Sequence, residues 1–140
     1  MSPEKKIALE LHPAKANCSQ AIAAAYAPRF GIPSDTASRM TMGLGRGVSG
    51  LNEICGTIAG VSVVLGMAFG NDPGGQKRVF ALTREFAEQF ASANGSIICG
   101  QLLGLVPSPS GKPLTKRSCH DLVADACDFL DSVLPSPSSH

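Results

Sequence analysis

Residues 54–70 read ICGTIAGVSVVLGMAFG, a stretch that decides the fold because it has no charged side chain yet contains four glycines. Its length is at the short limit of the about 17–25 apolar residues that a membrane span needs. Glu53 and Asp72 lie at its two ends, with no basic flank. We therefore predict a central, buried helix over residues 52–70 rather than a membrane span.

The composition is that of one ordinary domain. The chain has 140 residues, and 12 Lys and Arg against 11 Asp and Glu leave a net charge of +1. Such a balance excludes a strongly electrostatic nucleic-acid binder. The start, MSPEKKIALELH, has no apolar run and is not a secretory signal. We expect a cytoplasmic, reducing environment, in which repeated cysteines more often mean ligands or redox thiols than disulfides.

The rest of the chain predicts further helices around this centre. Apolar residues recur at helical spacing, and Pro or Gly ends most segments. No segment alternates as a strand does. The sequence predicts an all-α, single-domain helical bundle over residues 1–134, with about four longer helices and several short ones. Predicted helices cover residues 4–11, 14–27, 34–42, 76–91, 97–103 and 118–134; predicted loops cover the glycine-rich 43–50 and residues 106–113; residues 135–140 form a disordered tail.

The five cysteines carry most of the functional information. None belongs to a CxxC pair, so a zinc ribbon, a thioredoxin-type dithiol and a c-type haem site have no support. Ser118 predicts a helix start that places Cys119 at the first helical position. Similar logic places Cys99 and Cys55 in first turns, where free backbone N–H groups and the helix dipole stabilise a thiolate. Cys18 is predicted one turn further into its helix.

Four of the cysteines are predicted to share one site. Cys127 follows Cys119 by two helical turns on the apolar stripe, so we interpret Cys127 as a core residue. The other four come from different helices and can meet only at a common centre of the bundle. A four-thiolate centre is what iron–sulfur clusters and tetrahedral zinc sites use. The predicted site, for metal binding or catalysis, consists of Cys18, Cys55, Cys99 and Cys119.

Glycines and one arginine are candidates for contact with a cofactor. Gly56 and Gly60 follow Cys55 at helical spacing, and a glycine inside a helix costs about 0.5–1 kcal/mol relative to alanine. Close approach of another helix or of a bound group would offset that cost. The string GRGVSG, residues 45–50, matches GxGxxG without the preceding strand of a dinucleotide site. Its backbone, with Arg46, is predicted to hold an anion or to lie against a cluster.

The histidines are weaker candidates. His12 precedes Pro13 and is predicted to be a cap or surface residue. His120 follows Cys119, so it is a candidate ligand or proton partner, although at the second helical position we expect it to face solvent. No Ser/His/Asp arrangement and no carboxylate pair supports a hydrolase.

The order of these motifs resembles a known family. The motifs are NCSQA at residues 17–21, MGLGRG at 42–47, CGTIAG at 55–60, VLG at 64–66, Cys99 with LLG at 102–104, and Cys119. Together they are similar to the C_GCAxxG_C_C family of redox-active proteins, with Thr57 in place of the family's alanine and Cys127 as an addition. The resemblance implies a redox or cluster-binding role, and a similar domain accompanies haem in the split-Soret cytochromes.

Three functions stay open at this point. The first is electron transfer through an iron–sulfur cluster or another thiolate-bound metal, such as zinc. The second is a metal-free thiol/disulfide couple with a dedicated partner protein, in which Cys99 and Cys119 exchange electrons through a transient disulfide. The third is a non-catalytic structural or interaction module whose cysteines are only core. The low charged fraction, 16%, also makes a homodimer plausible.

Overall fold

The computed structural model describes residues 1–111, 114 and 117–135. Over these residues the secondary structure is helical, without strands, which confirms the all-α prediction. Residues 112–113 of the predicted loop and 136–140 of the predicted tail lie outside the described part. The elements are α1 (Pro3–Leu11), α2 (Cys18–Tyr26), η1 (Ala27–Phe30), α3 (Ser34–Thr41), η2 (Met42–Leu44), α4 (Gly45–Val48), α5 (Gly56–Phe69), α6 (Gly75–Asn94), α7 (Cys99–Leu102) and α8 (Cys119–Val133).

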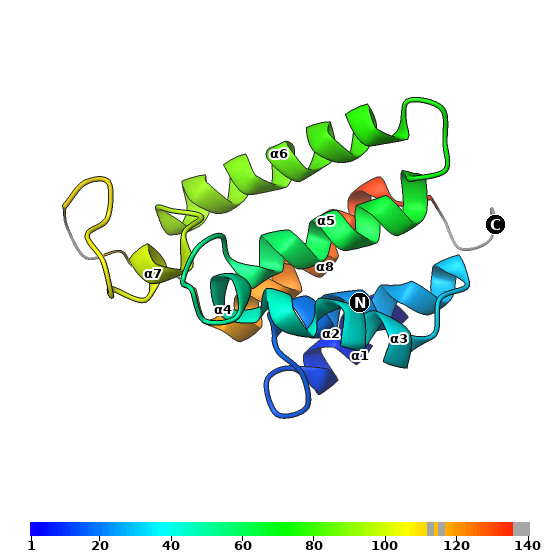
Figure 1. Ribbon diagram of the computed structural model, residues 1–140, viewed down its shortest axis with the longest axis horizontal. Coiled ribbons are helices and arrows are strands. Elements are labelled where there is room, and N and C mark those ends of the chain that lie inside the picture. The colour runs from blue at the N-terminus through cyan, green and yellow to red at the C-terminus, as the bar shows by residue number, and fades with distance from the viewer. Residues whose placement is uncertain (112–113, 115–116, 136–140) are drawn as a thin grey trace.

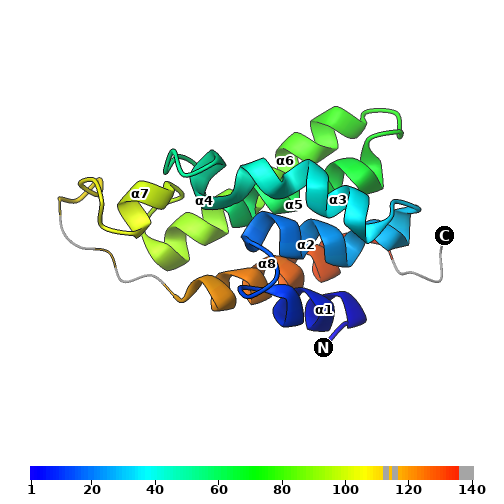
Figure 2. The same cartoon turned by 60° about the horizontal axis from the view of Figure 1, so that its bottom comes forward.

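The central apolar helix, α5, organises the other helices. Figure 1 shows α6 running antiparallel to α5 along one side, after a turn over residues 70–74. On the other sides, α5 packs against α2 and α8. Helix α8 also packs against α1, so that the first and last helices of the chain lie side by side (Figure 2). The short helices α4 and α7 lie together at one end, where α5 begins.

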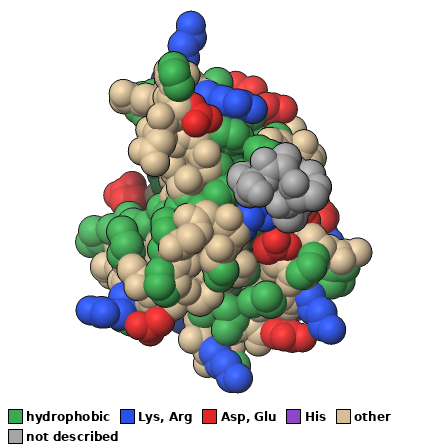
Figure 3. Space-filling model, turned by 90° about the vertical axis from the view of Figure 1, so that its right-hand side faces the viewer, with side chains coloured by type: hydrophobic (Ala, Val, Ile, Leu, Met, Phe, Trp, Pro, Cys, Tyr) green, Lys and Arg blue, Asp and Glu red, His purple; other side chains and the backbone are tan. Residues whose placement is uncertain are grey.

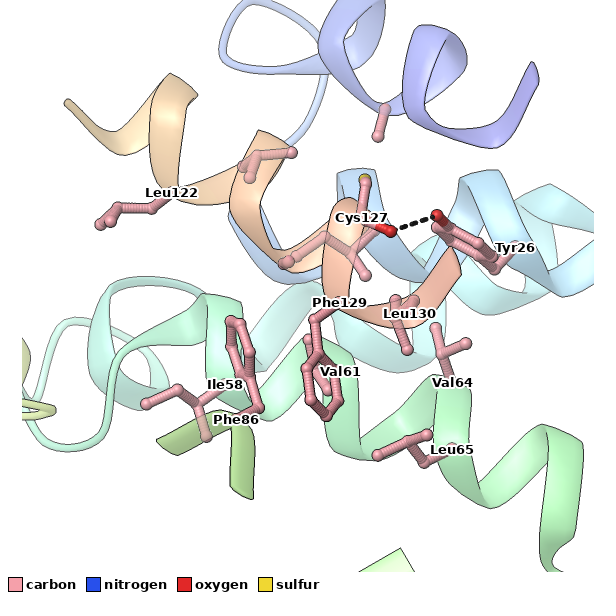
Figure 4. Packing of buried hydrophobic residues seen from close by; sticks show 14 of the residues in the cluster. Tyr26, Ile58, Val61, Val64, Leu65, Phe86, Leu122, Cys127, Phe129 and Leu130 are labelled. Atoms are coloured by element: carbon pink, nitrogen blue, oxygen red, sulfur yellow. Dashed lines mark hydrogen bonds between the residues drawn. The ribbon is translucent and has the colours of Figure 1, made fainter. Parts of the chain in front are cut away.

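The core is built from the inward faces of these helices. Val61, Val64 and Leu65 of α5 are fully buried and face residues of α8 such as Leu130 (Figure 4). Tyr26 of α2 is also fully buried, and its hydroxyl donates hydrogen bonds to the Asp131 carboxylate at 2.7 Å and to the Cys127 carbonyl at 3.2 Å. These hydrogen bonds satisfy the buried hydroxyl and link α2 to α8 inside the apolar core.

On the face of the molecule near the α5–α6 turn, charged side chains are dispersed and do not form a patch of one sign (Figure 3). Viewed from the end near the α5–α6 turn, basic and acidic side chains alternate around the rim with apolar and uncharged groups between them (Figure 3). No described helix has the length and apolar character that a membrane span needs.

Helix α5 begins later than the sequence predicts. The residues before it are extended and pair with the segment before α7, through a bridge between Ile54 and Ile98. Two backbone hydrogen bonds flank this bridge, from Cys55 N–H to Ile97 at 2.8 Å and from Cys99 N–H to Glu53 at 2.6 Å. Because these partners lie far apart in the sequence, local helical periodicity does not reveal the pairing.

The glycine-rich segment before this bridge is a left-handed turn. Arg46, Gly47, Val48 and Ser49 have φ angles of 54°, 65°, 67° and 51°. Left-handed backbone costs roughly 1–2 kcal/mol for each residue that carries a Cβ, and a β-branched valine is a rare occupant. The predicted loop is thus a turn with a strained, left-handed backbone. It leads into the residues that pair with the segment before α7.

Two glycines inside α5, Gly60 and Gly66, differ in the space around them. A Cβ on Gly60 would come within 3.2 Å of Ser19 Cα and 3.3 Å of Ile22 Cβ, both on α2, whereas a Cβ on Gly66 would meet nothing within 4 Å. Gly60→Ala should therefore push α5 from α2 and lower the free energy of unfolding by about 1–3 kcal/mol. Gly66→Ala, the matched control, should raise it by about 0.5–1 kcal/mol. Urea unfolding checks both, and a Gly60→Ala variant as stable as the parent would contradict this packing.

Candidate functional site

All four cysteines of the predicted site lie at the start of a helix. Cys119 is the first residue of α8, with the Ser118 hydroxyl accepting from Asp121 N–H at 3.1 Å, as predicted. Cys99 is the first residue of α7, and Cys55 is the N-cap of α5. Each of the four thiols is thus close to the N-terminal end of a helix, where the helix dipole is positive.

The position predicted for Cys18 was wrong. It is the first residue of α2 rather than one turn inside a longer helix, because Asn17 and Gln20 form a reciprocal capping box. The Asn17 side chain accepts from Gln20 N–H at 3.0 Å, and the Gln20 side chain accepts from Asn17 N–H at 3.1 Å. The two hydrogen bonds fix the start of α2 at the cysteine.

Cys18 and Cys119 are in direct contact across the α2–α8 interface. The pKa of the Cys18 thiol is raised well above its ordinary value, first by a hydrogen bond with the Cys119 side chain, then by burial and by the charges of Cys119 and Cys55. Cys18 is partly buried and Cys119 is exposed. The pair thus combines a sheltered thiol that holds its proton with an accessible thiol that a partner can reach.

Cys55 lies beside this pair and is itself buried, with 8% of its surface exposed. Its sulfur lies 2.8 Å from the hydroxyl oxygen of Thr57. Thr57 is the residue that departs from the family's alanine, and it is fully buried. The added hydroxyl therefore has a hydrogen-bond partner in the neighbouring cysteine.

Cys99 shares a face of the backbone bridge with Cys55. Because Ile54 is paired with Ile98, Cys55 lies opposite Ile97 and Cys99 lies opposite Glu53. Residues two apart on an extended segment point to the same side, so the two cysteines are diagonal neighbours. Cys18 thus interacts with Cys119 and, electrostatically, with Cys55, while Cys55 and Cys99 lie on the same side of the bridge.

Sequence reasoning missed His12, which the structure adds to the site. It is the C-cap residue of α1, as a cap was expected, but only 8% of its surface is exposed. Its Nε2 lies 3.4 Å from Cys18 Sγ, and its Nδ1 lies 3.4 Å from His120 Nδ1. Burial and the charge of His120 lower the pKa of His12. His120 is exposed, as expected, and its ring stacks on that of His12.

The glycine motif serves the packing around Cys18. The Ser19 hydroxyl donates to the Gly56 carbonyl at 2.7 Å, and a Cβ on Gly56 would come within 2.8 Å of that hydroxyl oxygen. The Asn17 amide donates to the Met42 carbonyl at 3.1 Å. The two neighbours of Cys18 are therefore hydrogen-bonded to other elements: Ser19 to the start of α5, and Asn17 to Met42, just before the glycine-rich turn. Arg46 is exposed within that turn, and contact of Arg46, Gly56 or Gly60 with a cofactor stays a prediction.

Cys127 belongs to the core, which confirms its interpretation from the sequence. It is fully buried in α8 among the apolar side chains of the bundle (Figure 4). Burial raises the pKa of its thiol to about 12. Cys127 therefore stays protonated at neutral pH and takes no part in thiolate chemistry.

A thiolate metal centre requires three or four donor side chains around one point. Among residues 1–111, 114 and 117–135, no group of three or more His, Cys, Asp or Glu side chains has that arrangement. We therefore derive no step through a metal ion or cluster, and the iron–sulfur or zinc centre stays a prediction from the sequence.

The fold and the site together define a small all-α protein in which four cysteines lie at the starts of four separate helices. A family model described as "Putative redox-active protein (C_GCAxxG_C_C)" matches residues 16–133, and the chain belongs to this family. The match includes all five cysteines and His120, whereas His12 lies before it. No curated protein and no solved structure matches the chain.

Proposed function

We propose that this redox-active protein works by thiol–disulfide exchange, with Cys18 and Cys119 as the exchanging pair. The single observation that carries the proposal is the side-chain interaction between these two cysteines, which lie far apart in the sequence and meet where α2 packs against α8. Two thiols in such contact need only a small movement to form a disulfide. The pair differs from the Cys99 and Cys119 pair that the sequence predicts, because the capping box at Asn17 brings Cys18 to the helix end that faces α8.

The two thiols have different roles. Cys119 is exposed and starts α8, so its thiolate attacks one sulfur of a partner protein's disulfide and releases the other sulfur as a thiolate. A mixed disulfide then links Cys119 to the partner. Cys18 loses its proton and attacks Cys119 Sγ, which releases the second partner thiolate and leaves a Cys18–Cys119 disulfide. Two electrons pass to the partner, and its two thiolates take up the two protons lost by the cysteines.

Oxidation of the metal-free protein by glutathione disulfide tests this proposal. We expect the reduced protein to lose two of its five thiols, with peptide mass mapping to a Cys18–Cys119 bond and an unchanged far-UV circular dichroism spectrum. The same result is expected for Cys127→Ala, the matched control, because this thiol is buried in the core.

Two outcomes would overturn the proposal. One is a disulfide that maps to another pair in the folded protein. The other is iron or zinc bound in stoichiometric amount to protein purified without oxygen, with the four cysteines protected from alkylation. The second outcome would favour the metal centre that the sequence predicts.

A further inference from the structure

We propose that His12 accepts the proton of Cys18 during exchange and passes it to solvent through His120. The proposal deepens the proposed function, on which it rests, by assigning the proton step to two histidines. Its basis is a continuous line of contacts: Cys18 Sγ to His12 Nε2 at 3.4 Å, then His12 Nδ1 to His120 Nδ1 at 3.4 Å. The line begins at a partly buried thiol, passes a buried imidazole and ends at an exposed one.

The attack by Cys18 needs such an acceptor. The thiolate and not the thiol is the nucleophile, so the partly buried Cys18 must lose its proton before it attacks. Burial also keeps bulk water from serving as a base at this sulfur. The nitrogen of His12 is the nearby group with a free lone pair, provided that the imidazole is neutral.

His12 is suited to that role by its position, because its buried ring contacts Cys18 through Nε2 and His120 through Nδ1. The titratable groups that the structure brings to His12 are Cys18 from α2 and His120 from α8; Cys119 precedes His120 on α8. A neutral His12 with its Nε2 free for Cys18 carries its proton on Nδ1, and a neutral His120 accepts that proton at its own Nδ1. Uptake at Nε2 and release from Nδ1 then move one proton outward without net charge on His12.

The order of events follows from what holds the Cys18 proton. Once Cys119 is part of a mixed disulfide, its sulfur carries no negative charge and is a poorer hydrogen-bond acceptor. Cys18 therefore becomes easier to deprotonate at the step that needs its thiolate, and His12 is already in contact with it.

The test separates the two exchange steps of the metal-free protein with glutathione disulfide. The first glutathione released reports attack by Cys119, and the second reports attack by Cys18. We expect His12→Gln to slow the second release at pH 7 by about 10²-fold, a usual contribution of general base catalysis, and to change the first less than about threefold. Added imidazole should restore part of the second rate, and the loss should shrink at pH 9. His120→Gln should slow the second release by a smaller factor.

Other outcomes would overturn the role of His12 and leave the exchange itself standing. One such outcome is an unchanged rate of release of the second glutathione in His12→Gln. Another is an equal loss of rate in both steps that neither imidazole nor pH changes, since this marks a purely structural role. Thermal unfolding of each variant identifies loss of fold, and His12→Asn provides a second variant if glutamine does not fold. Failure of the parent protein to form the Cys18–Cys119 disulfide would instead overturn the proposed function.

Discussion

Replacing Cys18 with serine is expected to trap glutathione on Cys119. In the parent protein the mixed disulfide is short-lived, because the Cys18 sulfur lies beside the Cys119 sulfur that it attacks. In Cys18→Ser no thiol is placed to resolve it, so one glutathione should remain bound per chain. Cys119→Ser should react more slowly than Cys18→Ser, because the remaining Cys18 thiol is partly buried whereas Cys119 is exposed. Intact-protein mass spectrometry after a timed exposure to glutathione disulfide measures both variants.

Cys99→Ser provides the control for this trapping experiment. The sequence alone pairs Cys99 with Cys119, and on that pairing Cys99→Ser would trap glutathione as Cys18→Ser does. On the structural pairing it resolves as fast as the parent protein, since Cys18 is the thiol that interacts with Cys119 and Cys99 lies diagonally from Cys55 across the bridge. Equal trapping by Cys18→Ser and Cys99→Ser would show that the exchanging pair is not unique.

The parts of the fold that depend on local signals were predictable from the sequence. Ser118 is a polar N-cap before an apolar stripe, and Cys119 does begin α8. Gly95 ends α6 at a φ of 89°, which the Asn-Gly pair there indicates. In each case residues within one helical turn decide the structure, so the pattern and the backbone agree.

Features that depend on distant partners were not predictable. Asn17 and Gln20 carry a capping signal, yet the alanine-rich run around them favours an earlier helix start. The bridge between Ile54 and Ile98 shortens α5, and neither residue is part of a strand pattern. His12 is buried because α1 packs against both α2 and α8, an arrangement that no spacing in the sequence indicates.

The positions of three of the four cysteines near helix starts could be predicted from the motifs. The position of Cys18 depends on the capping box, and its interaction with Cys119 depends on how α2 meets α8 in the core. Tyr26 holds these two helices together through its hydrogen bonds to Asp131 and to the Cys127 carbonyl. The geometry of the exchanging pair therefore depends on the packing of the core, so changes to the core and changes of redox state should both affect stability.

Leu130→Ala should lower the free energy of unfolding of the reduced protein by about 3 kcal/mol. Leu130 is fully buried in α8, and truncation of such a leucine removes apolar burial and leaves a cavity. Leu105→Ala, the matched control, removes a side chain that is 63% exposed and should change stability by less than about 0.5 kcal/mol. Urea unfolding of the reduced proteins measures both.

Oxidation should offset the loss in Leu130→Ala. A disulfide between Cys18 and Cys119 closes a loop of roughly 100 residues, which in the chain-entropy model stabilises a fold by about 4–5 kcal/mol. The oxidised variant should then be at least as stable as the reduced parent, because the bond joins α2 to the helix that the substitution loosens. Gly66→Ala, which changes neither interface, should gain the same increment on oxidation as the parent. An oxidised Leu130→Ala protein that unfolds at the same urea concentration as its reduced form would contradict a bond between these two helices, since any cross-link of that span constrains the unfolded chain.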